Sequence, residues 1–321
     1  MTALTAKPGL ALDRAKFQHP DLTADGNDRA SVALDGLQTL WFNTGTLCNL
    51  TCENCYIESS PTNDRLSYLS LDEVVEYLDE IDRDGLPTTE IGFTGGEPFM
   101  NPDFCAMLDA VLSRGYQALV LTNAMRPMMK CEAALRDLRA RYGEKLLIRV
   151  SLDHYQPVLH ELVRGAHSWK PAIDGLRWLS DNGFRLHVAA RTCWHESEAQ
   201  TRAGFGKLFA REGVAVDASD PVTLLLLPEM DETLDVPEIT TDCWDTLGIA
   251  PETMMCASSR MVVKRKGAAR PAVVACTLLP YDEAFELGHS LADASDAVKL
   301  NHPHCARFCV LGGGSCSRSA T

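Results

Sequence analysis

Short apolar runs alternate with amphipathic stretches along most of this chain, and this alternation limits its possible folds more than any other feature. The pattern predicts strands separated by helices, which implies a parallel sheet with right-handed crossovers. The fold class expected is therefore α/β. Six such strands are too few to close an eight-stranded barrel. The expected strands are 38–43, 90–93, 118–121, 146–150, 186–190 and 223–227, and the expected helices are 70–83, 102–113, 133–142, 157–164, 170–182 and 202–211.

The segment before the first of these strands is less regular. Residues 1–28 are polar, and we expect them to be loosely ordered. Residues 31–34 and 38–43 flank Asp35 and Gly36, a pattern typical of a hairpin with a two-residue primed turn. The second strand of this hairpin would lead directly into a loop that contains three cysteines.

That loop contains Cys48, Cys52 and Cys55 in a C-x3-C-x2-C pattern. Three thiolates are one fewer than a metal centre usually takes, and a [4Fe-4S] cluster held in this way keeps one iron free for a small molecule. Zinc is more often enclosed by two pairs of ligands, and no second pair or histidine lies near these cysteines in the sequence. The pattern therefore favours an iron–sulfur cluster with an open site.

A second motif, Gly95-Gly96-Glu97-Pro98, follows the strand expected at 90–93. Two glycines allow the backbone to approach a ligand closely, and a carboxylate beside them suits a bound ammonium group. The alternative is a tight turn that follows a strand, together with three buried thiols in the earlier loop. The presence of both motifs at this separation favours the ligand-binding interpretation.

Together the two motifs resemble those of the radical S-adenosylmethionine (SAM) superfamily. The resemblance implies a partial (β/α)6 TIM barrel whose ligands collect at the C-terminal ends of the strands. It implies a [4Fe-4S] cluster whose free iron chelates the amino and carboxylate groups of SAM, and reductive cleavage of SAM to a 5′-deoxyadenosyl radical. An external electron donor such as flavodoxin or ferredoxin is implied as well.

The resemblance also assigns SAM-binding roles to residues at the ends of the expected strands. The glycine motif would contact the methionine amino group, Asn123 would line the ribose side, and Ser151 with Arg164 would reach the methionine carboxylate. Arg191 is an alternative contact to SAM or substrate. Asn123 could equally be a turn residue, and Arg164 a solvated helix charge. The SAM-binding set is thus Gly95, Gly96, Glu97, Asn123, Ser151, Arg164 and Arg191.

The position before the third cysteine is commonly aromatic in this superfamily, and here it is Asn54. This departure puts the side-chain part of the adenine contact in doubt but leaves the backbone part intact. His160 is expected to be a structural hydrogen-bonding residue and not a ligand.

The C-terminal part of the chain is rich in cysteine and loses the regular alternation. Cys256, Cys276, Cys305 and Cys309 are separated by 19, 28 and 3 residues. This region resembles the twitch/SPASM region that carries auxiliary iron–sulfur clusters, and the resemblance implies one auxiliary [4Fe-4S] cluster. Cys316 or Cys243 would be a spare or substitute ligand, and a four-cysteine zinc site is the alternative. Packing roles are expected for Cys105, Cys131 and Cys193.

These observations divide the chain into a polar N-terminal segment (1–28), a radical SAM partial barrel (29–240) and a small α+β, cysteine-rich auxiliary-cluster domain (241–321). The net charge of −14 argues against nucleic acid as substrate. Neither a signal peptide nor an apolar stretch long enough to cross a membrane occurs, so a cytoplasmic location without membrane contact is expected. Twelve cysteines then indicate metal ligands and free thiols in preference to disulfides.

The function expected from the sequence is that of a radical SAM oxidoreductase that abstracts a hydrogen atom from a small molecule, with the auxiliary cluster as electron acceptor. About thirty residues before the hairpin are too few for the leader-peptide recognition domain of many peptide-modifying relatives, which favours a small-molecule substrate. The alternatives are a redox-neutral epimerisation or rearrangement and the modification of a short peptide. The non-enzymatic alternative is an iron–sulfur or zinc-binding protein that serves as an interaction scaffold.

Overall fold

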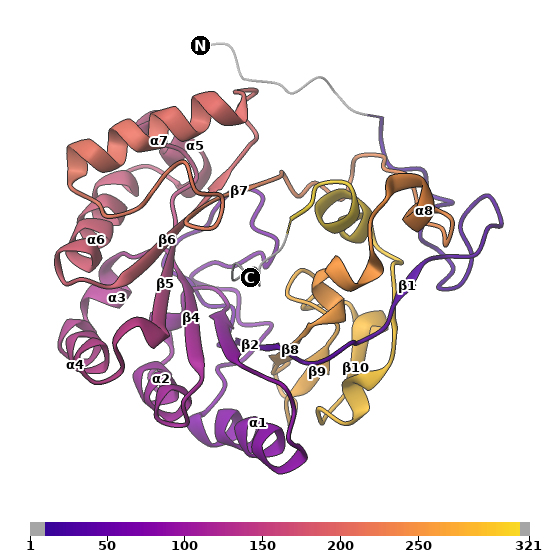
Figure 1. Cartoon of the computed structure of the whole chain (residues 1–321), viewed down its shortest axis with the longest axis horizontal. Coiled ribbons are helices and arrows are strands. Elements are labelled where there is room, and N and C mark those ends of the chain that lie inside the picture. The colour runs from indigo at the N-terminus through magenta and orange to yellow at the C-terminus, as the bar shows by residue number, and fades with distance from the viewer. Residues whose placement is uncertain (1–9, 315–321) are drawn as a thin grey trace.

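Six parallel strands form the centre of the molecule in a computed structural model that describes residues 10–314 (Figure 1). They are hydrogen-bonded in chain order, so each strand lies beside the next one in the sequence. This confirms the predicted α/β fold with a partial barrel. The strands are β2 (Thr39–Asn43), β3 (Glu90–Thr94), β4 (Gln117–Thr122), β5 (Leu146–Ser151), β6 (Arg185–Arg191) and β7 (Leu224–Leu227).

Helices cover the outer side of these strands, as expected for right-handed crossovers (Figure 1). The first of them begins with a capping box in which Ser70 and Glu73 each accept a hydrogen bond from the other's backbone N–H. A short helix, α3, was not predicted. The helices are α1 (Leu71–Asp84), α2 (Phe104–Ser113), α3 (Arg126–Met129), α4 (Glu132–Tyr142), α5 (Pro157–Arg164), α6 (Trp169–Asp181) and α7 (Glu198–Glu212).

The C-terminal region extends the same sheet. Strand β8 (Ser259–Val263) pairs in parallel with β2, and β9 (Ala272–Val274) and β10 (Glu286–Gly288) follow in antiparallel pairing. The resulting nine-stranded sheet has the order β10-β9-β8-β2-β3-β4-β5-β6-β7. The region also contains α8 (Cys243–Leu247) and a π-helical turn (Cys305–Val310), and short 3-10 helices occur at Pro98–Met100, Gly143–Lys145, Pro251–Thr253, Met255–Ala257, Glu283–Phe285 and Asp293–Ser295.

The predicted hairpin does not form. Strand β1 (Ser31–Val32) pairs with β11 (Val298–Lys299), whereas β2 is flanked by β3 and β8. A primed turn of type I′ needs a positive φ at both central residues, and neither Asp35 nor Gly36 has one. Instead, the backbone N–H of Asp35 donates to the Ala257 carbonyl at 2.8 Å. The segment therefore crosses to the C-terminal region and does not fold back on itself.

The expectation of a loosely ordered N-terminal segment was also wrong for residues 10–28. This segment packs on residues 231–241, where the Glu238 carboxylate accepts backbone hydrogen bonds from Phe17 and Ala24 at 2.7 and 2.6 Å. Glu238 also pairs with the buried Arg29 at 2.5 Å. One buried carboxylate thus fastens the segment to the body of the protein.

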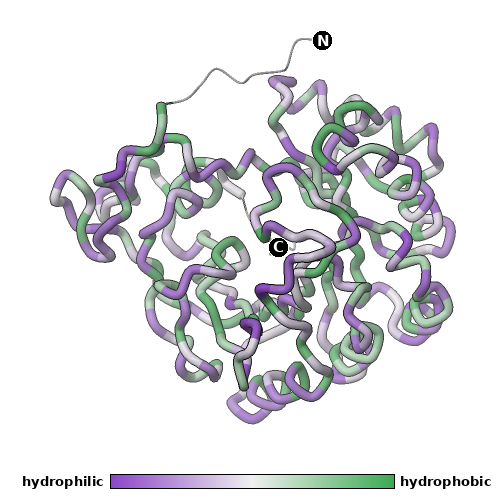
Figure 2. Tube along the Cα trace, turned by 180° about the vertical axis from the view of Figure 1, so that it is seen from behind, coloured by the Kyte–Doolittle hydropathy of each residue, from purple (hydrophilic) through white to green (hydrophobic). Residues whose placement is uncertain are grey.

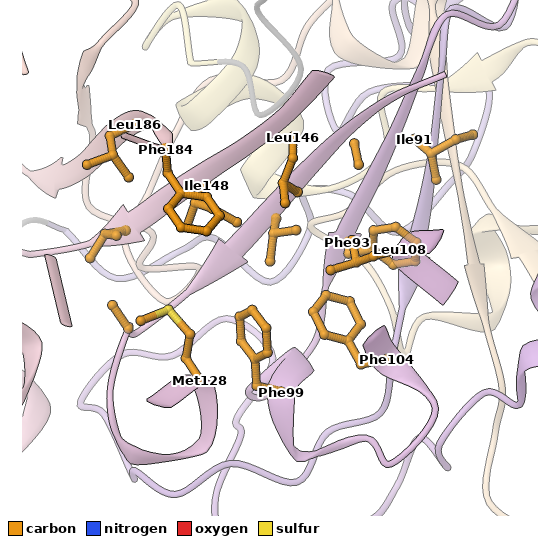
Figure 3. Packing of buried hydrophobic residues seen from close by; sticks show 14 of the residues in the cluster. Ile91, Phe93, Phe99, Phe104, Leu108, Met128, Leu146, Ile148, Phe184 and Leu186 are labelled. Carbon is orange, nitrogen blue, oxygen red and sulfur yellow. The ribbon is translucent and has the colours of Figure 1, made fainter. Parts of the chain in front are cut away.

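An apolar core fills the space between the strands and the outer helices. Figure 3 shows aromatic rings packed there, with ring centroids 5.3 Å apart for Phe93 and Phe104 and 4.8 Å apart for Phe99 and Phe104. Edge-to-face pairs of this kind suit the charge distribution of aromatic rings. Hydrophobic colour follows the central strands in Figure 2, and the surrounding helices show mixed colours along their length. Within residues 10–314, no helix is long and apolar enough to cross a membrane.

Candidate functional site

The glycine turn after β3 lies directly against the segment that precedes the cysteines. The Gly96 N–H donates to the Gly45 carbonyl at 2.8 Å, and the Glu97 N–H donates to the Leu47 carbonyl at 3.1 Å. A Cβ atom on Gly96 would lie 2.2 Å from the Leu47 carbonyl oxygen, and one on Gly95 would lie 2.5 Å from that of Gly45. The two glycines therefore allow the turn to fix the start of the cysteine loop.

Glu97 lies beneath this turn and links the ends of two strands. Its carboxylate accepts hydrogen bonds from the Thr122 hydroxyl at 2.8 Å, the Asn123 N–H at 2.9 Å and the Phe99 N–H at 3.3 Å. Burial raises the pKa of Glu97 to about 7, although these hydrogen bonds oppose the increase. Because Glu97 is only 1% exposed, its role in this structure is to position β4 against the glycine turn. Its contact with the SAM amino group stays a prediction.

Asn123 connects the end of β4 to the cysteine loop. Its side-chain N–H group donates to the Asn49 amide oxygen at 3.0 Å and approaches the Cys48 sulfur at 3.9 Å. Its amide oxygen accepts from the Met125 N–H at 3.1 Å. The strand-end turn and the loop contact thus occur together, so the turn interpretation of this residue does not exclude a place in the site.

These elements enclose one cavity of about 200 Å³. Burial raises the pKa of Cys48 to about 12 and also raises that of Cys52, so both are neutral thiols without metal. A coordinating metal deprotonates such thiols. All of the predicted ligands of the first cluster and all predicted SAM-binding residues except Glu97 line the cavity: Cys48, Cys52, Cys55, Gly95, Gly96, Asn123, Ser151, Arg164 and Arg191.

Arg164 is part of a buried ion pair that the sequence did not predict. Its Nε and Nη2 atoms donate to the two oxygens of Asp153 at 2.5 and 3.2 Å. Burial alone would raise the pKa of Asp153, but the Arg164 guanidinium reverses the effect and holds this pKa below its usual value. Within residues 10–314, the Nη1 atom of Arg164 makes no protein hydrogen bond, so it remains available to a ligand in the cavity.

Arg191 is also engaged. Its guanidinium pairs with Glu229, and its Nη1 atom donates to the Glu53 carbonyl at 3.2 Å. Glu229 also accepts a hydrogen bond from the Asn54 side chain at 3.0 Å. Arg191 therefore holds the cysteine loop in place from the end of β6, and it lines the cavity from there.

Two groups of cavity residues escaped the sequence reasoning. Arg149 lies on β5 two residues before Ser151, and the period of two along a strand could have placed both on the inner face. The other group forms an apolar wall and comes from β7, the segment after it and the C-terminal region. No local motif marks this wall, which consists of Leu225, Leu227, Pro228, Met230, Leu278 and Phe308.

A second cavity brings the four C-terminal cysteines together. It is lined by Cys256, Cys276, Cys305 and Cys309 among apolar side chains that include Leu278. The predicted spare ligand Cys243 does not line this cavity. Its sulfur instead accepts a hydrogen bond from the Thr240 N–H at 3.3 Å and shares another with the Thr240 hydroxyl at 3.4 Å. The other spare ligand, Cys316, lies outside the described residues.

The spacing of the thiols bears on the kind of metal centre. In a tetrahedral zinc site with Zn–S bonds of 2.3 Å, the sulfur atoms lie about 3.8 Å apart. Within residues 10–314, the only three ligand atoms of His, Cys, Asp or Glu that lie within 4.8 Å of one another belong to Glu232, His302 and His304. Neither cysteine set is therefore arranged around a single ion.

Comparison with known proteins agrees with this geometry. Residues 42–195 match the model of the Radical SAM superfamily. The chain belongs to the radical SAM superfamily of enzymes. It is 34% identical over 143 residues to the antilisterial bacteriocin subtilosin biosynthesis protein AlbA of Bacillus subtilis, a match that covers 44% of this chain and 30% of AlbA.

Two further kinds of relative extend the comparison. The mycofactocin maturase MftC of Mycolicibacterium smegmatis is 29% identical over 137 residues, which cover 43% of this chain and 33% of MftC. The match thus spans about a third of the length of these curated relatives. Among solved structures, Streptococcus suis SuiB bound to the precursor peptide SuiA has a TM-score of 0.58 at 11% identity, and covers 82% of this chain and 66% of SuiB.

The structure of histidine-tagged anSMEcpe with bound AdoMet has a TM-score of 0.57 at 14% identity, and covers 84% of this chain and 82% of that protein. At these identities the structural likeness shows the fold alone. The shared fold includes most of this radical SAM chain, beyond the residues that the family model matches.

Proposed function

We propose that this radical SAM chain cleaves SAM reductively and removes a hydrogen atom from a carbon of a peptide. The observation that most supports this proposal is one cavity lined by three cysteines, a glycine turn and the polar ends of β4 and β5. When bound, a [4Fe-4S] cluster and SAM supply a 5′-deoxyadenosyl radical. The residues of the chain hold these groups and shape the space beside them.

Each part of the cavity suits one part of that task. Cys48, Cys52 and Cys55 would hold the cluster through three thiolates and leave one iron open. Arg164 would offer its Nη1 group to the methionine carboxylate, because Asp153 already fixes the orientation of the guanidinium. The ribose would lie toward Asn123, and the glycine turn with Glu97 would face the amino group.

The apolar wall supports the choice of substrate class. The side chains of Leu225, Leu227, Met230, Leu278 and Phe308 line the cavity that also holds the cysteines. An apolar side chain of a bound peptide would bury hydrophobic surface against this wall. Two relatives are connected with peptides by name, since AlbA serves bacteriocin biosynthesis and SuiB was solved with a precursor peptide. We therefore propose a peptide in preference to the small molecule expected from the sequence.

The second cavity would hold an auxiliary [4Fe-4S] cluster through Cys256, Cys276, Cys305 and Cys309. Its chemistry there would be to accept one electron from the substrate radical, after the hydrogen atom has passed to the deoxyadenosyl radical, and the second hydrogen would leave the peptide as a proton to solvent. Leu278 lines both cavities, so the substrate space and the auxiliary site adjoin at this residue. An external donor such as flavodoxin or ferredoxin would reduce the first cluster.

The proposal is tested by anaerobic incubation of the reduced, reconstituted protein with SAM and with synthetic peptides that correspond to short reading frames beside its coding sequence. Chromatography should show 5′-deoxyadenosine and methionine, and mass spectrometry should show one of the peptides with two hydrogens fewer. Replacement of Cys52 by alanine should abolish both products, because two thiolates cannot hold the open cluster.

The Cys105→Ala variant is the matched control, because Cys105 is predicted to pack, is not a predicted ligand and lines neither cavity. It should form both products at a rate close to that of the wild type. Undiminished 5′-deoxyadenosine from the Cys52→Ala variant would refute SAM cleavage at this site. Formation of 5′-deoxyadenosine while every peptide stays unchanged would refute the peptide assignment but not SAM cleavage.

A further inference from the structure

Arg260, on β8, is one of the largest fully buried side chains of the protein, with an exposed fraction of 1%. Its Nε atom donates to the Ala294 carbonyl at 2.8 Å, and its Nη1 atom donates to the carbonyls of Cys256 and Ser259 at 2.6 and 2.8 Å. Its Nη2 atom donates to the Asp296 carbonyl at 3.1 Å. All four acceptors are backbone oxygens, which fix the guanidinium but carry no full negative charge.

The absence of a carboxylate partner distinguishes Arg260 from two other arginines. The buried Arg29 pairs with Glu238, and the largely buried Arg164 pairs with Asp153. Within residues 10–314, Arg260 takes part in no ion pair. A guanidinium stays protonated in proteins, and a buried charge without a counter-charge is strongly unfavourable. The protein therefore holds a positive charge here whose partner is not supplied by an acidic side chain.

The candidates for that partner are the sulfurs of two cysteines. The Arg260 guanidinium interacts electrostatically with the sulfurs of Cys256 and Cys276. Both cysteines line the second cavity, and Cys256 also accepts a bond from Arg260 through its carbonyl.

We infer that Arg260 provides the positive counter-charge for an iron–sulfur cluster in the second cavity and raises the reduction potential of that cluster. The inference rests on the auxiliary cluster of the proposed function. Four thiolates give such a cluster a net negative charge, and reduction adds one more. A fixed positive charge in a medium of low dielectric constant therefore stabilises the reduced form more than the oxidised form.

This role matches the position of Arg260 in the fold. Its four carbonyl contacts come from the 3-10 helix at Met255–Ala257, from β8 and from the segment around Asp293–Ser295. They hold the guanidinium beside two ligands of the cluster without neutralising it. A higher potential makes the cluster a better electron acceptor, which is the task proposed for it. Arg260 would thus act on the cluster through its fixed charge and not as a ligand.

The test is a redox titration of the full chain reconstituted with both clusters, followed by electron paramagnetic resonance. Arg260→Gln should lower the midpoint potential of the auxiliary cluster. We expect the ratio of reduced to oxidised auxiliary cluster at a fixed potential to fall at least about tenfold, or about 59 mV for one electron. The first cluster, recognised by the change of its signal when SAM is added, should keep its potential and serves as the internal control.

Arg260→Lys separates charge from hydrogen bonding, because lysine keeps a positive charge but cannot reproduce the fork of carbonyl contacts. Its auxiliary-cluster potential should stay close to that of the wild type. Equal shifts in the glutamine and lysine variants would show that the carbonyl contacts alone matter, and would overturn the inference. If the glutamine variant retains no auxiliary iron, the lysine variant decides: retention at a near wild-type potential supports the charge role, and loss of the cluster overturns it.

Iron analysis keeps this result separate from the proposed function. A wild-type chain with only about four irons would refute the auxiliary cluster itself, and the inference with it. A wild-type chain with about eight irons and a glutamine variant of unchanged potential would refute the role of Arg260 alone.

Discussion

Gly96 matters in this site because it lacks a side chain, but the group that comes close to it is not the predicted one. Its lack of a side chain was expected to let a ligand approach the backbone, and in the structure it lets the chain approach itself. The Leu47 carbonyl lies where a Cβ atom on Gly96 would be. Because Leu47 directly precedes Cys48, the position of the first cysteine depends on this contact.

Gly96→Ala should therefore displace the cysteine loop and prevent assembly of the first cluster. We expect the iron content to fall from about eight to about four per chain, because only the auxiliary site would still be loaded. The crowding should also cost about 1–3 kcal/mol of unfolding free energy. Iron analysis and urea unfolding measure the two effects.

Gly206→Ala is the control for Gly96→Ala. Gly206 lies in α7, and the nearest atom to an added methyl group would be 3.8 Å away, an ordinary contact distance. Its iron content should equal that of the wild type, and its stability should be unchanged or slightly higher, because alanine favours helix more than glycine does. Full iron loading in the Gly96 variant would contradict the steric account.

Sequence motifs were sufficient for residues whose role depends on spacing along the chain. The cysteine triplet and the glycine pair are of this kind. Glu97 and Asp153 are different, because their roles depend on which donors the fold places beside them. Nothing in the local sequence indicates that Glu97 is enclosed by groups from β4, or that Asp153 faces a guanidinium eleven residues later.

At the scale of secondary-structure elements, the pair of Asp153 and Arg164 joins the end of α5 to the segment after β5. Both side chains are largely buried, with 4% and 14% of their surface exposed. A buried charge that loses its partner is destabilising, whereas loss of both charges is tolerated better. The pair should therefore show strong energetic coupling.

Asp153→Asn should lower the free energy of unfolding by about 3–5 kcal/mol, because Arg164 is left without its counter-charge. The double variant Asp153→Asn with Arg164→Gln should be less destabilised than the sum of the single variants, by about 0.5–3 kcal/mol. Urea unfolding under anaerobic conditions measures all three variants.

The exposed pair of Lys170 and Asp174 on α6 is the matched control for this cycle. Asp174→Asn should change stability by less than about 1 kcal/mol, as is usual for a surface ion pair. Strictly additive effects of the Asp153 and Arg164 substitutions would show that the ion pair does not couple the two elements.

The elements themselves were predicted well where the sequence is periodic. The six parallel strands and their helices follow from local alternation. The hairpin prediction failed because pairing depends on distant partners: β1 pairs with Val298–Lys299, and β2 pairs with Ser259–Val263. No local pattern identifies partners more than two hundred residues away. Such pairings are decided by the packing of the whole chain.

At the scale of the whole molecule, the barrel and the C-terminal region share a single sheet and adjoining cavities. The parallel pairing of β8 with β2 places the second cysteine set on the barrel, and Leu278 lines the cavities of both sets. The sequence suggested a second cluster but not its place. That place depends on the β2–β8 pairing, and so does the part of the apolar wall that Leu278 and Phe308 form.

The arrangement of the two cysteine sets predicts the iron content of the protein. Reconstituted wild type should contain about eight irons per chain, because each set holds one four-iron cluster. Joint replacement of Cys48, Cys52 and Cys55 by alanine should leave about four irons, and so should joint replacement of Cys256, Cys276, Cys305 and Cys309. Metal analysis with Mössbauer spectroscopy measures these contents.

A variant with Cys105 and Cys131 replaced by alanine is the control, since neither residue lines a cysteine cavity, and it should keep about eight irons. About eight irons in the triple variant would require two auxiliary clusters and further ligands such as Cys316. Zinc in place of iron in the triple variant would make the second set a structural site. The auxiliary electron acceptor would then be refuted, whereas SAM cleavage at the first set would remain open to its own test, because the two cavities use separate ligands.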